Sequence, residues 1–364
     1  MTVDATDAFK SIPTLDLSRV ETDKAGLLAD LQHALIHVGF FYVKNHGIPV
    51  EFLDETTARA VEFFDLPLEE KLKADKINSP TFLGYSVQGN EITKNKKDNR
   101  EQLDFANELA EFWKPGQPEY ERLTGPNVWP DAKVIPGFKE SILEYWDRTH
   151  ELASRLSRLV AEALGLAPDA LEKYVTQDQQ HRAKLIKYPA VDDLAAADGN
   201  QGVGAHRDTA NLITVLYQAN DMPGLQVQNH AGEWIDATPM RGTFVVNIGT
   251  GLEYLVDGVA VATTHRVLNP LPGKGPRYSI AYFHGARLDQ KLYPTPIPQE
   301  VLDQKPTDVV TDTAGFQFAA LYAQNPGLYA VLNRMSSHRD VAAKWYPELA
   351  KEHGIDVSAA NGGY

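Results

Sequence analysis

The chain has 364 residues, of which 43% are hydrophobic, enough to bury a large core in one domain or two modest ones. Its net charge of −14 argues against nucleic acid and anionic membrane surfaces as partners, because both select basic faces. The absence of cysteine excludes disulfides, thiolate catalysis and sulfur-ligated metals, so any metal would need His, Asp or Glu ligands. We find no apolar signal segment and no run of about eighteen apolar residues, and therefore expect a cytoplasmic protein without a membrane span.

The first half of the chain is predicted to contain mainly helices. Apolar residues at helical spacing over 25–38 end at Gly39, and a strand is expected in the following run, "FFYVKNHGI". A second helix over 61–74 is expected to break at Pro67, and a long amphipathic helix is expected over 136–165. The polar run at 90–104, "NEITKNKKDNREQLD", has the composition of a loop that could lie over a pocket.

From residue 183 to residue 285 the pattern changes to short β-rich runs separated by Gly, Pro and Asp turns. Many short strands at this spacing favour a sandwich or a jelly roll. Helical patterns return in "FQFAALYAQN" and "HRDVAAKWYPELAKEH". We expect a mainly β fold with flanking helices. Residues 1–364 would form one domain, with an N-terminal helix and strand region at 1–180, a β core at 181–290 and a C-terminal helical region at 291–364.

The tripeptide His-Arg-Asp occurs twice, at 206–208 and at 338–340. The first copy stands where a turn meets an apolar, β-branched stretch, and residues i and i+2 of an extended chain point to one face. His206 and Asp208 could therefore aim an imidazole and a carboxylate at one point. The second copy follows Ser336 and Ser337, either of which is a typical N-cap, and residues two apart diverge on a helix. We expect metal chemistry at the first copy and helix-start chemistry at the second.

A third candidate ligand, His265, lies on a later predicted strand of the same β region. Two imidazoles and one carboxylate form the facial triad of non-haem Fe(II) oxygenases, although a zinc hydrolase could use the same ligands. Arg277 and Ser279 follow in "RYS", two residues apart, and a guanidinium beside a hydroxyl is a good receptor for a carboxylate. This combination favours a co-substrate that chelates the metal and is anchored at its far end.

These motifs resemble the isopenicillin N synthase-like family of Fe(II)/2-oxoglutarate-dependent dioxygenases, in its small-molecule oxygenase branch. "IPTLDLS" and "GFFYVKNHGI" resemble the N-terminal signature, and "KYPA", "HRD", "VNIG", "THRV" and "RYS" follow in the family's order over nearly the whole chain. The resemblance implies a distorted double-stranded β-helix, which is a jelly roll, with N-terminal, central and C-terminal helices around it.

The resemblance also implies Fe(II) as cofactor, 2-oxoglutarate as co-substrate and O₂ as oxidant. The implied iron ligands are His206, Asp208 and His265. The implied contacts of 2-oxoglutarate are Arg277 and Ser279 at its distal carboxylate, together with Tyr188. The reaction would couple oxidative decarboxylation of 2-oxoglutarate to succinate and CO₂ with hydroxylation, desaturation or ring closure of a substrate.

Two segments, "GYSVQGNEIT" and "AYFHGARLDQKLYP", are similar to parts of the bacterial ethylene-forming enzyme and of fungal small-molecule oxygenases. By this analogy the substrate pocket is lined by Glu91, Thr93, Lys184, Phe283 and Arg334. Because buried charges need partners, we expect a small polar substrate with a carboxylate, an amino acid or a close derivative. The alternative is that these charges pair with one another and leave an apolar pocket.

Two other classes of function remain open at this stage. One is an iron-dependent oxidase that uses no 2-oxoglutarate, and the other is a non-catalytic binding protein on the same fold. Stoichiometric release of succinate would distinguish a 2-oxoglutarate-dependent oxygenase from the iron-dependent oxidase. The expected partner is a small molecule, and the expected state is a monomer.

Overall fold

The computed structural model describes residues 8–93, 96–175, 179–191, 201–305 and 321–357. Strands of the larger, eight-stranded sheet follow the order β1 (Thr14–Asp16), β2 (Phe40–Lys44), β12 (Phe244–Ile248), β9 (Asn211–Gln218), β14 (Arg277–Gly285), β7 (Arg182–Tyr188), β6 (Glu101–Ala106) and β3 (Gly84–Ser86). The four-stranded sheet has the order β11 (Trp234–Asp236), β10 (Leu225–Gln228), β13 (His265–Leu268) and β8 (Gln201–His206). A short hairpin joins β4 (Ile92–Thr93) to β5 (Lys96–Lys97).

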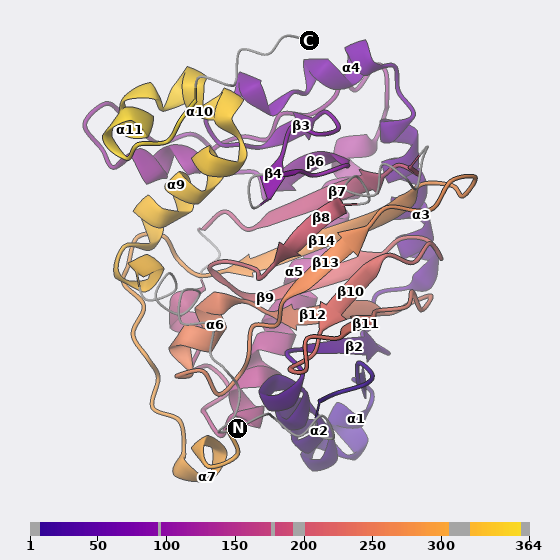
Figure 1. Ribbon diagram of the computed structural model, residues 1–364, viewed down its shortest axis with the longest axis vertical. Coiled ribbons are helices and arrows are strands. Elements are labelled where there is room, and N and C mark those ends of the chain that lie inside the picture. The colour runs from indigo at the N-terminus through magenta and orange to yellow at the C-terminus, as the bar shows by residue number, and fades with distance from the viewer. Residues whose placement is uncertain (1–7, 94–95, 176–178, 192–200, 306–320, 358–364) are drawn as a thin grey trace.

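The helices surround this pair of sheets (Figure 1). Those of the N-terminal half are α1 (Arg19–Thr22), α2 (Lys24–His37), α3 (Val50–Phe64), α4 (Leu68–Lys73) and α5 (Phe138–Ala163). Those of the C-terminal half are α6 (Thr250–Leu255), α7 (Gln299–Leu302), α9 (Pro326–Ser337), α10 (Arg339–Trp345) and α11 (Pro347–Glu352). Three 3₁₀ turns, η1 (Lys76–Asn78), η2 (Glu119–Leu123) and η3 (Glu172–Tyr174), lie between them in the chain.

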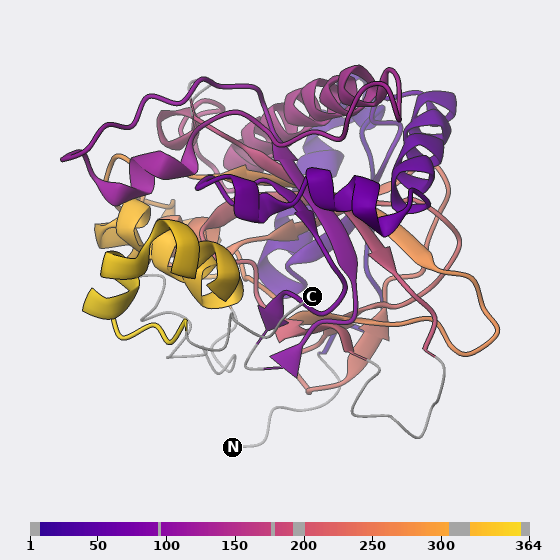
Figure 2. The ribbon, with the colours of Figure 1, turned by 90° about the horizontal axis from the view of Figure 1, so that it is seen from above.

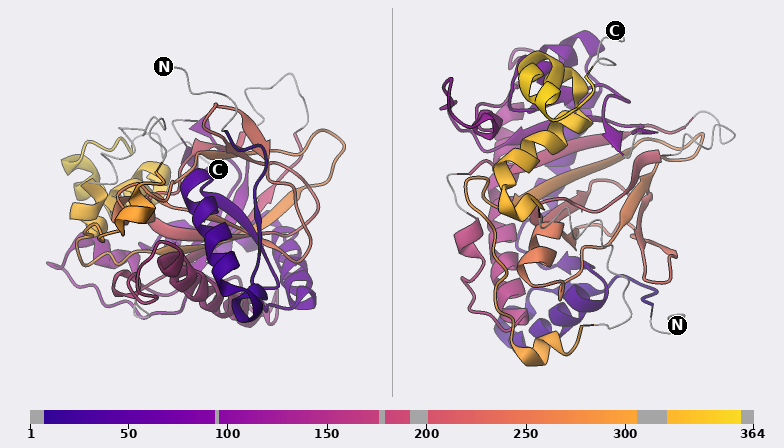
Figure 3. Two further views of the ribbon diagram at one scale, coloured as in Figure 1. Left: turned by 90° about the horizontal axis from the view of Figure 1, so that it is seen from below. Right: turned by 60° about the vertical axis from the view of Figure 1, so that its left-hand side comes forward.

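Two apolar cores hold the layers together. The larger core joins the eight-stranded sheet to α2, α3 and α5, and α5 runs along the face of that sheet away from the smaller sheet (Figure 3). The smaller core fills the space between the two sheets and includes Ile186, Tyr188 and Val203. Two facing sheets with helices outside form the expected jelly roll, and strands from 14–106 extend the larger sheet at both edges.

The predicted helices are confirmed wherever the structure describes them. The first ends at His37, before Gly39 with its positive φ of 71°. The second is interrupted at Pro67 as expected, but the part before this proline, α3, begins already at Val50 rather than at residue 61. The long central helix is α5. The helix expected in 316–325 lies largely outside the described residues.

The loop expected at 90–104 is wrong at its C-terminal end, where residues from Glu101 onward form β6 between β3 and β7. The charged residues of this strand suggested an exposed loop, but in the structure its carboxylates are paired with lysines inside the molecule. Glu101 forms ion pairs with Lys71 and Lys187, and Asp104 forms one with Lys76.

The strand expected at 260–268 begins only at His265. The preceding residues bond instead to the end of α2, where Thr263 Oγ1 donates to Val38 O at 2.7 Å and Val261 N donates to Leu35 O at 3.0 Å. Gly39 allows this approach, since a Cβ there would lie 2.3 Å from Val261 O. This packing sets the position at which His265 enters the smaller sheet.

Replacement of Leu185 tests the larger core. This side chain is 0% exposed in β7, so Leu185→Ala should lower the free energy of unfolding by about 2–5 kcal/mol through lost burial and a residual cavity. Leu68→Ala is the matched control, because Leu68 is 52% exposed. Urea denaturation of both variants measures the difference, and equal losses would contradict this account of the core.

Candidate metal centre and adjoining cavity

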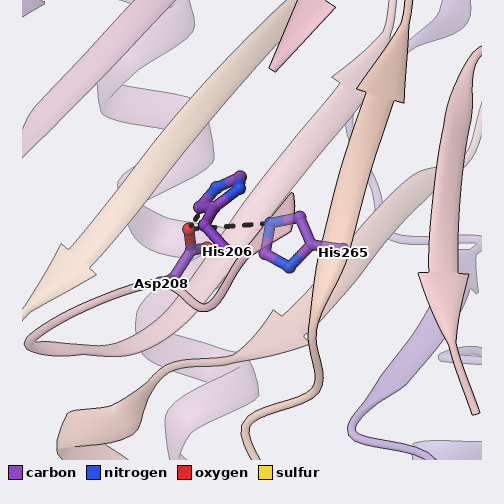
Figure 4. Close-up of side chains that lie close together, drawn as sticks. All are labelled: His206, Asp208 and His265. Carbon is purple, nitrogen blue, oxygen red and sulfur yellow. Dashed lines mark ion pairs between the residues drawn. The ribbon is translucent and has the colours of Figure 1, made fainter. Parts of the chain in front are cut away.

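Three potential metal ligands converge between neighbouring strands of the smaller sheet (Figure 4). His206 is the last residue of β8, Asp208 follows two residues later, and His265 is the first residue of β13, opposite His206. Asp208 Oδ1 lies 3.6 Å from His206 Nε2 and 3.7 Å from His265 Nε2. The three ligand atoms lie within 4.8 Å of one another, and this is the single such group among the described residues.

Hydrogen bonds to the backbone orient both imidazoles. His206 Nδ1 lies 2.8 Å from Gly204 O, and His265 Nδ1 lies 3.1 Å from Thr263 O. Because a carbonyl oxygen only accepts, each Nδ1 carries the proton and each Nε2 keeps a lone pair. Burial, reinforced by the imidazole of His206, lowers the pKa of His265 to about 4. His265 is therefore neutral near pH 7 and available to bind a metal ion.

The carboxylate of Asp208 is held at one oxygen and left available at the other. Thr214 Oγ1 donates to Oδ2 at 2.5 Å and Asn247 Nδ2 donates to it at 2.8 Å. Burial alone would raise the pKa of Asp208, but His206, His265 and Asn247 outweigh it and lower the pKa below its ordinary value. Two Nε2 lone pairs and an ionised Oδ1 fit a divalent metal ion with no sulfur ligand.

Sequence reasoning missed both residues that hold Asp208. Thr214 and Asn247 lie in β9 and β12, inside the apolar runs "NLITVLY" and "FVVNIG". Their side chains are buried at 4% and 3% exposure. A polar residue at a buried position of an apolar strand needs an internal partner, and that pattern is the signal that could have found them.

The candidate contacts of 2-oxoglutarate lie close together between the sheets. Arg277 is 1% exposed and faces Tyr188 across β14 and β7, with its Cζ 5.0 Å from the Tyr188 ring centroid. Its Nη2 donates to Gln218 Oε1 at 3.1 Å, whereas Nε, Nη1 and Ser279 Oγ have no hydrogen-bond partner. No described carboxylate pairs with Arg277 within ion-pair distance, so the arrangement fits an anionic ligand.

A cavity of about 650 Å³ opens beside His206 and Asp208. Its wall includes Ile186 and Val203, which also belong to the core between the sheets. All five residues predicted to contact the substrate line it, namely Glu91, Thr93, Lys184, Phe283 and Arg334. The fold thus brings together the candidate metal ligands and the predicted pocket residues.

Within this cavity most of the predicted polar contacts already have partners in the protein. Glu91 forms ion pairs with Arg100 at 2.8 Å and with Lys184 at 3.1 Å, and Thr93 Oγ1 donates to Asp98 at 2.7 Å. Glu91 and Lys184 therefore pair with each other, which is the alternative that the sequence left open to pairing with a charged substrate. Arg334 differs, because it forms no ion pair with any described residue.

The second His-Arg-Asp tripeptide lies at the junction of α9 and α10, as expected for a helix start. The expected cap is wrong, however, because Ser336 and Ser337 end α9 and donate to carbonyls of its preceding turn. His338 is the N-cap residue, yet its side chain is buried, lines the cavity and contacts Lys76 Nζ through Nε2 at 2.9 Å. Burial and Lys76 lower the pKa of His338 to about 3.

Among the described residues, none of the helices is both long enough and apolar enough to cross a bilayer.

Comparison with known proteins places these features in a family. Residues 12–132 match the model described as the N-terminal region of non-haem dioxygenases in morphine synthesis, and residues 178–286 match the 2OG-Fe(II) oxygenase superfamily. The chain is 42% identical over 351 residues to the 2-oxoglutarate-dependent dioxygenase frbJ of Dothideomycetidae sp. (strain 11243), covering 94% of each protein. It is 33% identical to the homoarginine-6-hydroxylase 2-ODD-233 of Oryza sativa subsp. japonica, covering 80% of this chain and 90% of the relative.

Solved structures agree with the sequence comparisons. A full-length Neurospora crassa protein, crystallised in complex with α-ketoglutarate, which is 2-oxoglutarate, has a TM-score of 0.70 and 27% sequence identity, covering 88% of this chain and 95% of that one. The recognised signature, the jelly roll and the cofactor class are therefore confirmed. The chain belongs to the 2OG-Fe(II) oxygenase superfamily and is a dioxygenase that uses Fe(II), 2-oxoglutarate and O₂ to oxidise a small molecule.

Proposed function

We propose that His206, Asp208 and His265 are the iron ligands of this dioxygenase. The observation that carries the proposal is the convergence of two Nε2 lone pairs and one carboxylate oxygen within 4.8 Å. Bound Fe(II) would supply the redox chemistry that couples decarboxylation of 2-oxoglutarate to oxidation of a substrate C–H bond. The protein's own part is to orient the imidazoles and to hold Asp208 through Thr214 and Asn247.

We propose that Arg277, Ser279 and Tyr188 hold 2-oxoglutarate. A guanidinium buried to 1% exposure without a carboxylate partner would be costly unless a ligand supplied the opposite charge. The hydroxyl of Ser279 lies on the same strand two residues away and also lacks a partner. Tyr188 covers one face of the guanidinium and so limits the directions from which a carboxylate can approach.

We propose that the substrate is a small polar molecule, an amino acid or a close derivative, bound in the cavity beside the iron ligands. The cavity has room for such a molecule and is lined by Glu91, Thr93, Lys184, Phe283 and Arg334. The relative from rice is named as a hydroxylase of homoarginine, which is an amino acid. Phe283 would contribute apolar surface against the carbon chain, and the charged residues would exclude uncharged lipophilic compounds.

We further propose that residues 1–364 form one domain, and that the enzyme acts as a monomer in the cytoplasm. The eight-stranded sheet combines strands from 14–106 with strands from 182–285, which supports a single folding unit. One chain supplies all the candidate ligands and cavity residues, so the site needs no second subunit.

Alanine variants of the three ligands test the metal assignment. His206→Ala, Asp208→Ala and His265→Ala should each lose tight Fe(II) binding and substrate-dependent succinate release, because each removes one of three protein ligands. Anaerobic Fe(II) titration measures the loss. His338→Ala and Asp340→Ala are the matched controls from the second tripeptide and should retain iron. Loss of iron from the His338 variant with retention by the His206 variant would reverse the assignment.

A substitution at Arg277 tests the co-substrate site. Arg277→Gln should weaken 2-oxoglutarate binding by about 10- to 150-fold, since a hydrogen bond to a charged group contributes roughly 1.5–3 kcal/mol. The charge-transfer absorbance of iron-bound 2-oxoglutarate, titrated without oxygen, measures the dissociation constant. Arg241→Gln is the control, because Arg241 pairs with Asp54 and is 68% exposed. An unchanged constant in the Arg277 variant would remove this residue from the site.

A screen for substrate-dependent succinate release tests the substrate class. Amino acids and their derivatives should stimulate release above the rate without substrate, whereas uncharged aromatic and terpenoid compounds should not. On the best substrate, Glu91→Gln should lower kcat/KM by more than about twofold, because it leaves Arg100 and Lys184 underpaired at the cavity wall. An uncharged best substrate, with kcat/KM retained in this variant, would contradict the amino-acid proposal.

A further inference from the structure

Two arginines from distant parts of the chain line the same cavity. Arg182 is the first residue of β7, and Arg334 lies in the last turn of α9. Burial, together with the charge of Arg334, holds the pKa of Arg182 well below its ordinary value. Burial also lowers the pKa of Arg334. Both arginines are half-buried, and both line the same cavity.

Neither guanidinium pairs with a carboxylate of the described residues. Within the described residues, Arg182 donates to the backbone carbonyls of Thr81, Phe82 and Leu123. Arg334 Nη1 is buried without any hydrogen-bond partner. The neighbouring carboxylate, Asp104, is taken by other cations, with ion pairs of 2.7 Å to Lys76 and 3.6 Å to Lys184.

The buried charges around the cavity do not balance. Three carboxylates are linked by ion pairs within this cluster, namely Glu91, Asp98 and Asp104. Five cations face them, namely Lys76, Arg100, Lys184, Arg182 and Arg334. Asp289 also lines the cavity but pairs with Arg287. Glu121 lines it without an ion pair to either guanidinium in the described part of the chain. Asp208 lines the cavity as well, but it belongs to the proposed metal centre. Apart from Asp208, four carboxylates with Glu121 counted face five cations.

A desolvated cation is costly unless an opposite charge lies against it. We infer that Arg182 and Arg334 form a subsite for a carboxylate of the substrate, an inference that rests on the proposed function. Guanidiniums bind carboxylates through paired, charge-assisted hydrogen bonds, and Arg334 Nη1 is a donor that the described residues leave unused. Glu91 on the same wall is held by Arg100 and Lys184, so it is not available to neutralise Arg182 or Arg334.

This subsite is separate from the proposed anchor of 2-oxoglutarate. Arg277 lies on β14 between the two sheets, whereas Arg182 and Arg334 line the cavity with β7 and α9. The enzyme would therefore recognise two carboxylates with two sets of arginines, one for the co-substrate and one for the substrate. Loss of the substrate subsite should leave the co-substrate subsite intact.

Pairs of acids and their carboxamides test the inference directly. The probes are L-amino acids, including L-homoarginine, each with its carboxamide and its sulfonate or phosphonate analogue. Binding to the Fe(II) and 2-oxoglutarate complex is measured without oxygen by calorimetry and by the shift in melting temperature. At least one acid should bind about tenfold or more tightly than its carboxamide. Equal binding of acid and amide, no binding of any acid, or preference for the tetrahedral anions would overturn the carboxylate assignment.

Single substitutions then identify the residues. Arg334→Met and Arg182→Met should each weaken the best acid about tenfold or more, and Arg334→Lys should recover part of the loss by restoring the charge. Arg287→Met is the matched control from the same cavity, because Arg287 pairs with Asp289. Arg182 also donates hydrogen bonds to three backbone carbonyls, so Arg182→Met could destabilise the fold. The melting temperature of each variant is therefore compared with that of the unmodified protein. If Arg182→Met is destabilised, the result for Arg334→Met decides the test.

The dissociation constant of 2-oxoglutarate distinguishes failure of the carboxylate subsite from failure of the proposed function. If Arg334→Met weakens the acid but leaves 2-oxoglutarate binding within about twofold, the carboxylate subsite is supported. If the acid binds Arg334→Met and Arg287→Met equally well, the subsite is wrong while the proposed function stands. Failure of the unmodified protein to bind Fe(II) or 2-oxoglutarate at all would instead overturn the proposed function.

Discussion

The carboxylate of Asp208 is the point on which the candidate centre depends, because it connects the two sheets. Its Oδ2 accepts hydrogen bonds from Thr214 and Asn247 of the larger sheet, while its Oδ1 faces His206 and His265 of the smaller sheet. A carboxylate this deeply buried needs such partners, since burial alone opposes its charged form. The relative position of the sheets thus decides whether three ligand atoms converge, and the apolar core between the sheets maintains that position.

Ion pairs form one part of the cavity wall and of the strands behind it. The strand β6 carries Glu101 and Asp104, and β7 carries Lys184 and Lys187, so neighbouring strands supply opposite charges inside the molecule. Buried ion pairs contribute little net stability, because desolvation offsets most of their attraction. They do orient the polar wall, and a wall of this kind selects ligands by charge more sharply than an apolar wall of the same size.

The C-terminal helices lie beside segments from the first half of the chain (Figure 2). Residues of α9 form part of the cavity wall. The α9–α10 segment is attached to residues near η1 by three contacts: His338 to Lys76, Trp345 Nε1 to Ile77 O, and Tyr346 OH to Pro80 O. Arg334 reaches the cavity from this segment. The proposed metal centre thus belongs to the jelly roll, whereas the residues proposed to contact the substrate come from the N-terminal region, β7, β14 and α9.

The sequence by itself indicated most of the helices, the β-rich region and the paired candidate residues, because these features depend on local spacing. Residues two apart on a strand share a face, which identified His206 with Asp208 and Arg277 with Ser279 as candidates, and helical periodicity located α2 and α5. Only the tertiary structure decided which charges are paired. Glu101 and Asp104 read as loop residues until their lysines were placed beside them, and the partners of Glu91, Arg334 and His338 come from distant segments. Coulomb energy and desolvation depend on distance and burial in space, and neither quantity is encoded in the local pattern of residues.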